Sequence, residues 1–473
     1  MMISKIAVCP ICGKHTCLRI QNGGYLSEYP IRVNCMNCRA LLKGTYEMSD
    51  NTGPYGRLSM LNADIKECDI DNSSPTPMTA DAIRIRNADY VAEISGELPC
   101  NPVYKYTGGI PLSPFMRSIG NVESMEERIE RLKYFTKSMQ DWNKTKSIAF
   151  QLLDEGSVDY IAIALRNKMG SYTYECDHYL KSLHCLQEIV LEETKYLFIS
   201  PLQDDCILKL LRELSFVDKA KLHAFTNVID GAQGLLLAYR KVIEVFSNFM
   251  GIYPNVLPAE TYMRYKDKSL ASTGIATCSF QDIKTYYQDA YESLLSLFYV
   301  PVGLDNIVLR GDYQKFSSLY DDVNYKKGIH NIAGYRKLDN GTRCNKVDNR
   351  EIFQGIIDVP ANRLLRNGIG HNNNNYDGVT QVVTAYDMKK ANLVTVQMSL
   401  MEMAEDCIGL ARSAVILSEI ILFMLREELR PDNITTIIHP RFYLGSGPND
   451  KCPCGSNKKY KSCCRNEFER ISR

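Results

Sequence analysis

Several features are scarce or absent in this 473-residue chain. A large net charge is absent, because 56 lysines and arginines are balanced by 55 aspartates and glutamates, which gives a net charge of +1. No overall field therefore steers the chain toward nucleic acid or a membrane, and binding of a polyanion would need a local patch. Tryptophan occurs once, and the sequence contains no internal repeat.

Long hydrophobic runs are also absent. The most apolar stretch, Ala414–Leu425, contains Ser418 and Glu419 and is much shorter than the roughly twenty apolar residues of a membrane-spanning helix. We interpret it as a buried helix. The first residues, MMISKIAVCPIC, lack the apolar segment of a secretory signal, which predicts a cytoplasmic protein with no membrane partner. Its cysteines are then expected to be thiols or metal ligands rather than disulfides.

Cysteine, by contrast, is abundant: nine of the 17 cysteines lie among the first 40 or the last 22 residues, and the other eight are scattered. Hydrophobic residues make up 45% and charged residues 23% of the chain, which is ordinary for a folded globular protein. At roughly 100–200 residues per domain, this length suggests two to four domains. The composition and the cysteine distribution together predict a small metal module at each end of a larger body.

The first cysteine group consists of two C-x2-C pairs separated by 22 residues. Two residues between thiolates allow a tight turn to direct both sulfurs at one ion, and two such turns complete a tetrahedral zinc site. The pattern resembles a zinc ribbon, a structural module. His15 or Cys17 could replace one ligand, and free thiols in a small β-rich lobe are the alternative interpretation. The predicted ligands are Cys9, Cys12, Cys35 and Cys38.

The second group reads Cys452-Pro-Cys454-Gly-Ser-Asn-Lys-Lys-Tyr-Lys-Ser-Cys463-Cys464. It resembles the SEC-C motif, a zinc-binding tail module, and differs from it only in having Asn457 where glycine is usual. The resemblance implies that the four cysteines hold a second structural Zn²⁺. Residues 450–473 carry seven Lys or Arg against three Asp or Glu, which predicts a docking patch for RNA or a protein partner. Charges that only solvate a tail are the alternative.

A third pattern, NRLLRNGIGHNNNN, covers residues 362–375. It places a permanent cation, Arg366, and the polar Asn367 a few residues before His371, the side chain type that titrates near neutrality. Arginine can hold a phosphodiester while histidine transfers protons to or from the reacting oxygens. This combination suits RNA cleavage by the neighbouring 2′-hydroxyl. No acidic cluster lies nearby in the sequence, so we expect no catalytic metal.

The segment after this pattern makes it more specific. Residues 378–387 and 392–398 are typical of a β-hairpin joined at 388–391, and a long apolar helix follows. Arginine, asparagine, histidine, hairpin and final helix together resemble the HEPN superfamily, whose ribonucleases share an R-x4–6-H motif with a polar residue after the arginine. The resemblance implies catalytic roles for Arg366, Asn367 and His371, a helical bundle and a homodimer with a composite site. Many members are toxins or anti-phage effectors.

Helical periodicity begins at residue 124 and returns over 177–196, 206–214, 219–250, 280–299 and 399–429. We therefore expect a mainly α fold: a central helical bundle with a small β-rich zinc ribbon at the N-terminus and a small zinc knuckle at the C-terminus. The predicted domains are a zinc-ribbon-like module (1–70), an irregular linker plus helical lobe (71–200), a HEPN-like helical domain (201–430) and a SEC-C tail (431–473).

These patterns predict a cytoplasmic, metal-independent endoribonuclease that leaves 2′,3′-cyclic phosphate ends and acts as an anti-phage defence or toxin effector. RNA would be its substrate, and two structural Zn²⁺ ions per chain would stabilise the cysteine modules. The alternative is a non-catalytic HEPN and SEC-C scaffold that binds nucleic acid or a protein. Catalysis requires Arg366 and His371 in one groove, whereas a scaffold can bury or separate them.

Overall fold

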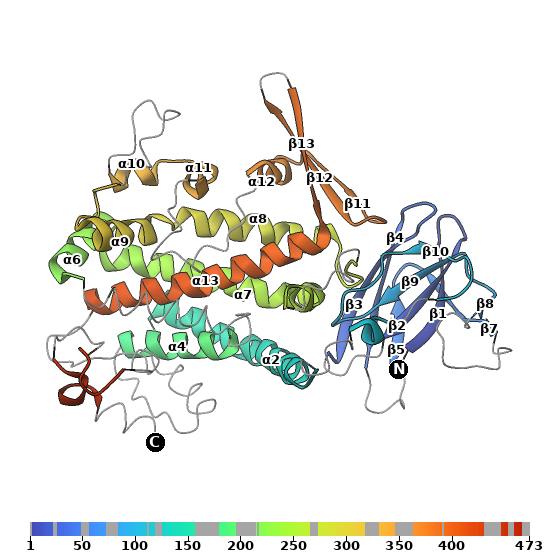
Figure 1. Ribbon diagram of the computed structural model, residues 1–473, viewed down its shortest axis with the longest axis horizontal. Coiled ribbons are helices and arrows are strands. Elements are labelled where there is room, and N and C mark those ends of the chain that lie inside the picture. Colours follow the sequence, from blue (N-terminus) through green and yellow to red (C-terminus); the bar gives the residue numbers. More distant parts are fainter. Residues whose placement is uncertain are drawn as a thin grey trace. The chain divides into compact units, whose positions relative to one another are not determined.

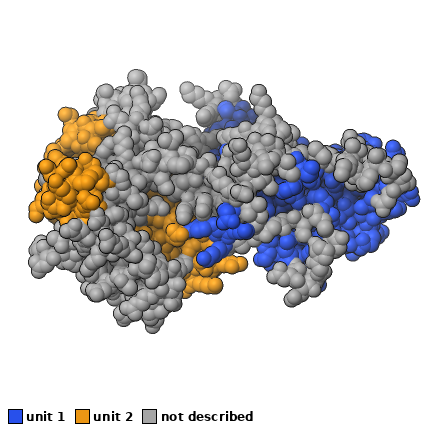
Figure 2. Space-filling view, turned by 60° about the horizontal axis from the view of Figure 1, so that its bottom comes forward, with its two compact units in different colours: residues 1–137, 249–288, 362–408 blue, residues 138–248, 289–361, 409–473 orange. Residues whose placement is uncertain are grey.

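The computed structural model forms two compact units, which are coloured separately in Figure 2. The first comprises residues 1–137, 249–288 and 362–408, and the second comprises residues 138–248, 289–361 and 409–473. The residues that the structure describes are 2–21, 26–48, 56–71, 84–110, 113–118, 125–156, 179–194, 214, 217–264, 273–316, 331–345, 363–389, 392–429, 446–452 and 458–465.

A five-stranded sheet of order β10-β9-β2-β1-β6 forms part of the first unit (Figure 1). Strands β1 and β2 are an antiparallel pair that flanks the first cysteine pair, and β9 joins β2 in parallel. β2 is buried along most of its length, as expected for a strand with neighbours on both sides. The strands are β1 (Met2–Val8), β2 (His15–Gln21), β6 (Asp64–Glu67), β9 (Tyr90–Ile94) and β10 (Tyr104–Lys105).

A second sheet, of order β3-β4-β5, carries the second cysteine pair between its first two strands. Burial alternates along β3 and β4, so one face of this hairpin packs on the interior. Tyr29 and Tyr46 are opposite each other there, with ring centroids 5.4 Å apart. The strands are β3 (Glu28–Asn34), β4 (Leu41–Glu47) and β5 (Arg57–Met60), and a short separate pair is formed by β7 (Ile70–Asp71) and β8 (Arg84–Ile85).

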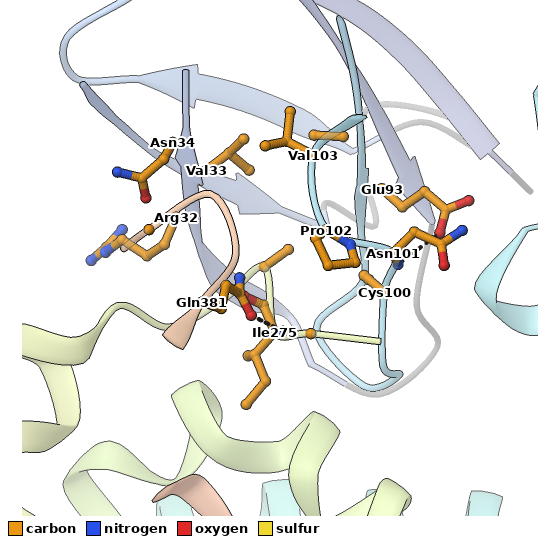
Figure 3. A pocket seen from close by; sticks show the side chains of 14 residues that line it. Arg32, Val33, Asn34, Glu93, Cys100, Asn101, Pro102, Val103, Ile275 and Gln381 are labelled. Carbon is orange, nitrogen blue, oxygen red and sulfur yellow. Dashed lines mark hydrogen bonds between the residues drawn. The ribbon is translucent and has the colours of Figure 1, made fainter. Parts of the chain in front are cut away.

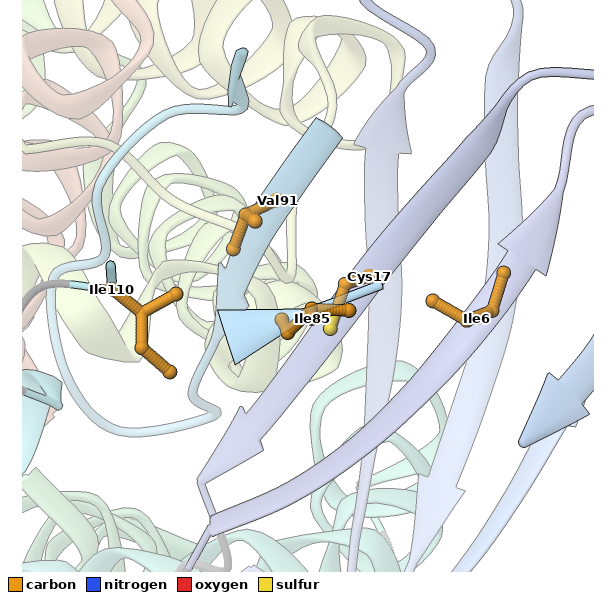
Figure 4. Close-up of a cluster of buried hydrophobic side chains, with 5 residues drawn as sticks. All are labelled: Ile6, Cys17, Ile85, Val91 and Ile110. Carbon is orange, nitrogen blue, oxygen red and sulfur yellow. The ribbon is translucent and has the colours of Figure 1, made fainter. Parts of the chain in front are cut away.

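A small apolar core holds the β-rich part together (Figure 4). Its members come from β1, β2, β8, β9 and the segment after β10, and each is at most 4% exposed. Removing this apolar surface from water favours the fold, because burial is worth roughly 25 cal/mol per Å². The core residues are Ile6, Cys17, Ile85, Val91 and Ile110. Three of them follow residue 70, so the β-rich fold extends beyond the first cysteine module.

The first unit also contains the predicted hairpin, which forms as β12 and β13. β11 pairs with β12 and makes a three-stranded sheet that the sequence analysis did not anticipate. Helix α12 packs closely on β12, because a Cβ added at Gly368 would lie 2.5 Å from the Cβ of Ala385. The elements are α1 (Pro114–Ser118), α12 (Arg363–Gly370), β11 (Asn374–Asp377), β12 (Val382–Lys389) and β13 (Asn392–Ser399).

Helices make up the second unit across its described residues up to 429. The indole of Trp142 packs on Phe246 with ring centroids 4.7 Å apart and donates a hydrogen bond of 3.1 Å to Ser247. Four of the helices, α2, α7, α8 and α13, extend into the first unit. The helices are α2 (Met125–Glu155), α4 (Tyr179–Thr194), α6 (Lys219–Val228), α7 (Gly231–Arg264), α8 (Phe280–Ser296), α9 (Tyr299–Arg310), α10 (Ile332–Arg336), α11 (Asn340–Asn345) and α13 (Leu400–Leu429).

The stretch Ala414–Leu425 lies in α13 and is buried at every position, as predicted. Two helical stretches, Phe280–Arg310 and Leu400–Leu429, are long and apolar enough to cross a membrane by length and composition alone. The apolar window of the second is 100% buried within the structure and that of the first is 67% buried. Core helices that are apolar all round have this property.

The prediction of a mainly α fold was wrong, because the described chain is mixed α and β. Residues 84–105, predicted to belong to an irregular linker, form β8, β9 and β10. Strands of two to five residues are too short to give a clear alternating pattern, and β9 finds its partner β2 about 70 residues away. Pairing over that distance is decided by tertiary packing. The predicted helix over 206–214 lies outside the described residues, apart from Leu214.

Candidate functional site

The two N-terminal cysteine pairs meet at one point, as the sequence predicts. All four Sγ atoms lie within 4.8 Å of one another. The Sγ atoms of Cys9 and Cys38 are 3.4 Å apart, and those of Cys12 and Cys35 are 3.6 Å apart. Four sulfurs bound tetrahedrally to one zinc at ~2.3 Å lie ~3.8 Å from each other. The cluster therefore has the dimensions and the donor chemistry of a closed four-cysteine metal site.

The two pairs form equivalent backbone turns. In the first, Gly13 donates its N–H to the carbonyl of Cys9 at 2.9 Å, and in the second Arg39 donates to Cys35 at 2.8 Å. Both donors have left-handed backbones, with φ of +69° for Gly13 and +63° for Arg39. Glycine suits this conformation, whereas arginine adopts it against a steric cost. The second turn is therefore strained where the first is not.

The thiols of the cluster differ in acidity. A backbone hydrogen bond from Lys14 lowers the pKa of Cys12 to about 6, whereas burial raises the pKa of Cys35 to about 12. Thiolate is the form that binds metal, so metal binding releases the thiol protons that remain. Cys12 gives the cluster a sulfur that ionises near neutrality.

His15 and Cys17, the alternative ligands, lie outside this cluster. The Nδ1 of His15 is 3.2 Å from the carbonyl oxygen of Asn87. Cys17 is buried in the core with its Sγ 3.8 Å from that of Cys68. The paired spacing therefore identified the cluster correctly.

A second cluster lies near the C-terminus. The Sγ atoms of Cys452, Cys463 and Cys464 lie within 4.8 Å of one another, and Cys454 lies outside the described residues. Backbone hydrogen bonds run from Cys452 to the carbonyl of Lys458 at 2.7 Å and from Cys463 to that of Tyr460 at 3.1 Å.

The described part of this C-terminal cluster contains η6 (Tyr460–Ser462), in which the Tyr460 ring is buried. Lys458, Lys459 and Lys461 are exposed, whereas Arg465 is half-buried.

The predicted catalytic residues lie on α12 and just beyond it. Leu365 and Ile369 are buried and anchor the helix, while Arg366 is half-buried. The Nη1 of Arg366 donates a hydrogen bond of 2.8 Å to Oδ1 of Asn367. His371 is exposed, and its N–H donates to the carbonyl of Asn367 at 2.9 Å, so it continues the last helical turn.

Helix geometry describes how these three side chains are distributed. Residues five apart on an α-helix are about 140° apart around its axis, so Arg366 and His371 do not share a face within one helix. Residues four apart do share a face, and Asn367 is four residues before His371. The amide of Asn367 therefore draws the guanidinium of Arg366 toward the side of the helix that carries His371.

The chain turns sharply after His371. Asn372 has a left-handed backbone with φ of +57°, and its Oδ1 accepts a hydrogen bond of 2.8 Å from the Nζ of Lys284. Asn374 donates from Nδ2 to the carbonyl of Gly368 at 3.1 Å and so ties the start of β11 back to α12. The side chain of a lysine thus contacts the residue that follows the predicted catalytic histidine. Sequence reasoning missed Lys284, because it is distant along the chain.

The turn formed by the second C-x2-C pair, Cys35 and Cys38, contributes another group that sequence reasoning missed. The guanidinium of Arg39 forms an ion pair of 2.6 Å with Asp377 at the end of β11. A signal for it was present in the sequence, since Arg39 follows its C-x2-C pair at the place where Gly13 follows the first. The cysteine module and the segment after His371 are therefore in direct contact.

Comparison with known proteins identifies one segment. The SEC-C motif family matches residues 449–466, which include Cys452, Cys463 and Cys464, so the chain carries a SEC-C motif there. No curated protein and no solved structure matches the chain. Both cysteine clusters are compatible with zinc binding. The HEPN resemblance of the segment containing Arg366 and His371 stays a prediction.

Proposed function

We propose that the protein is a metal-independent endoribonuclease of the HEPN type, with Arg366, Asn367 and His371 as its reacting groups. The observation that carries this proposal is the position of Asn367. Its side chain accepts from Arg366, and its carbonyl accepts from the backbone of His371. The guanidinium of Arg366 is thereby held by the residue that lies one helical turn before His371 on an anchored helix.

Each group has a role that its chemistry supports. The Arg366 guanidinium holds the scissile phosphate and stabilises the charge that develops on it. His371, which is exposed, transfers protons to or from the attacking 2′-oxygen and the leaving 5′-oxygen. Asn367 orients the guanidinium through the hydrogen bond of 2.8 Å. Lys284 contacts Asn372 and would add a second positive charge for binding the phosphates of RNA.

The HEPN resemblance implies a composite site, in which a second copy of the chain faces the first and the two motifs act together. We therefore propose a homodimer in which Arg366 of one copy acts with His371 of the other.

The two cysteine clusters have a structural role in this proposal. In the described part of the chain, the groups of three or more potential metal ligands are the two cysteine clusters, and neither includes Arg366 or His371. We propose that each cluster binds one Zn²⁺, with Cys454 completing the second. Bound zinc would cross-link each turn, and no step of RNA cleavage is assigned to it.

Digestion of RNA by the purified wild type and by His371→Ala, each with and without EDTA, tests the proposal. Wild type should cut RNA in both conditions, and His371→Ala should cut it far more slowly in both. His223→Ala is a matched control, because His223 is also exposed but pairs with Glu428 in the second unit. RNA binding without cleavage by the wild type would instead support the scaffold function. Growth arrest on expression of the wild type alone would support a toxin or defence role.

A further inference from the structure

Arg39 occupies a backbone conformation that its residue type disfavours. Its φ of +63° matches that of Gly13 in the equivalent turn, where glycine carries no such penalty. The turn therefore tolerates glycine, yet arginine is present at the strained position. Glycine could adopt this backbone conformation without strain. The presence of a strained arginine instead indicates that the arginine side chain has a function.

The side chain of Arg39 reaches a defined partner. Its Nη1 lies 2.6 Å from Oδ2 of Asp377, and the other oxygen of that carboxylate accepts from the N–H of Val379 at 3.0 Å. Burial acts to raise the pKa of Asp377, but the hydrogen bonds from Arg39 and from the backbone outweigh it and lower the pKa. The carboxylate is therefore held in its charged form between two turns. One is the turn of residues 35–39 that carries the second cysteine pair, called the metal turn below, and the other joins β11 to β12.

Neighbouring contacts reinforce this connection. The side chain of Asn34 approaches the backbone of Gly378 so closely that a Cβ there would lie 2.3 Å from it. The same Asn34 donates from Nδ2 to the carbonyl of Arg39 at 2.8 Å. The turn between β11 and β12 is therefore seated on the residues that flank the second cysteine pair.

A further set of hydrogen bonds lies at the base of the same turn. The side chain of Gln381 exchanges hydrogen bonds of 2.7 and 2.9 Å with the backbone of Ile275. Figure 3 shows Arg32, Asn34, Ile275 and Gln381 around the small pocket between these segments. The contact is thus formed by several groups, of which the Arg39 ion pair involves the metal turn directly.

The contact reaches the predicted catalytic segment through one short strand. Asp377 is the last residue of β11, which begins at Asn374 and is paired with β12. Asn374 is tied to Gly368 of α12, and His371 lies between them in the chain. Fixing the position of Asp377 therefore fixes β11, the strand that follows His371 in the chain.

We propose that metal bound by the four N-terminal cysteines positions His371, with Arg39 as the positioning residue. The metal fixes the second turn with Arg39 in its left-handed conformation, and that conformation directs the guanidinium to Asp377. The residues present fit a metal in this role, since the four sulfurs converge on one point next to Arg39. The consequence for RNA cleavage rests on the proposed function, but the ordering of residues 371–387 does not.

Hydrogen exchange on the full-length, metal-loaded protein tests the ordering. Arg39→Gly relieves the backbone strain and keeps the cysteines, so its zinc content should equal that of the wild type. Peptides within residues 371–387 should nevertheless exchange roughly two- to fivefold faster, the range expected for loss of an exposed ion pair. Asp377→Asn should give the same increase without altering the metal turn, and the double variant should add little to either.

Arg86→Ala is the matched control, because Arg86 forms a similarly exposed ion pair with Asp71 in the same unit. It should leave exchange in residues 371–387 unchanged. Cys38→Ser, which removes a metal ligand, should raise that exchange at least as much as Arg39→Gly. Wild-type exchange in both Arg39→Gly and Asp377→Asn would overturn the proposal. Absence of RNA cleavage by the wild type would overturn the proposed function and leave the exchange result standing.

Discussion

The guanidinium of Arg366 donates a hydrogen bond of 2.8 Å to the side chain of the next residue, Asn367. Adjacent residues on a helix ordinarily point in different directions, about 100° apart. This hydrogen bond therefore changes where the cation is presented and gives Asn367 a role that its type alone does not specify.

Substitutions in this trio should have graded effects on RNA cleavage. His371→Ala should slow cleavage by ~10²–10⁴-fold, because it removes a general acid or base. Arg366→Ala should be at least as harmful, and Arg366→Lys should restore little, since ammonium cannot form the same planar fork. Asn367→Ala should be milder, because the cation remains. Single-turnover rates on a labelled RNA measure all four.

The same assay identifies the chemistry. Products should carry a 2′,3′-cyclic phosphate and a 5′-hydroxyl, and DNA should not be cut because it lacks the 2′-hydroxyl. Cleavage that disappears in EDTA while the protein stays folded by circular dichroism would contradict the mechanism, as would a His371→Ala protein that cuts at the wild-type rate.

Assembly gives a second prediction. We expect a dimer by light scattering at micromolar concentration. The apolar α13 does not require one, because its most apolar window is buried within the single chain. The expectation rests on the HEPN resemblance, which implies a composite site shared between two copies. Mixing Arg366→Ala with His371→Ala should restore cleavage, since a mixed dimer contains one intact composite site. A site confined to one chain would show no such rescue.

Metal content gives a third prediction. Elemental analysis of the reduced protein should find two zinc ions per chain that resist mild EDTA treatment, because thiolate-only sites are closed and soft. Cys9→Ser and Cys463→Ser should each lose about one ion. Fewer than one zinc per wild-type chain would show that the clusters hold free thiols. Retention of both ions by either variant would reassign the ligands.

A fourth prediction concerns a buried polar network in the second unit. Tyr239 donates to Oε1 of Gln187 at 2.8 Å, and Nε2 of Gln187 donates to Glu419 at 2.6 Å and to Ser418 at 2.9 Å. All four residues are buried. Tyr239→Phe should lower the free energy of unfolding by ~1 kcal/mol, because it leaves a buried acceptor without this donor. Tyr262→Phe, half-buried on the same helix, is the control.

The same tyrosine makes stability depend on alkaline pH. Burial, and then the charge of Glu419, raise the pKa of Tyr239 well above its ordinary value of 10.0. The unfolded chain therefore loses this proton near pH 10 while the folded chain keeps it. The contribution is complete below that pH and declines above it. Tyr239→Phe should show a shallower loss of stability between neutral pH and pH 11 in chemical denaturation. An identical slope would contradict the assignment.

Local sequence determined several parts of this protein. The four N-terminal cysteines come together as their spacing predicts, because two residues between ligands suffice to form a metal-binding turn. The three described C-terminal cysteines also come together, as the resemblance to the SEC-C motif implies. The hairpin of β12 and β13 and the buried helix α13 also follow their patterns, since alternation and helical periodicity are encoded within a few turns of chain.

Contacts between distant segments decided the rest. The mixed α and β fold depends on β9 pairing with β2 about 70 residues away, and a strand of five residues gives too little pattern to reveal its partner. The ion pair of Arg39 with Asp377 and the hydrogen bond of Lys284 to Asn372 join residues far apart in the sequence. Their chemistry was visible in the sequence, but their proximity arises only when the chain packs.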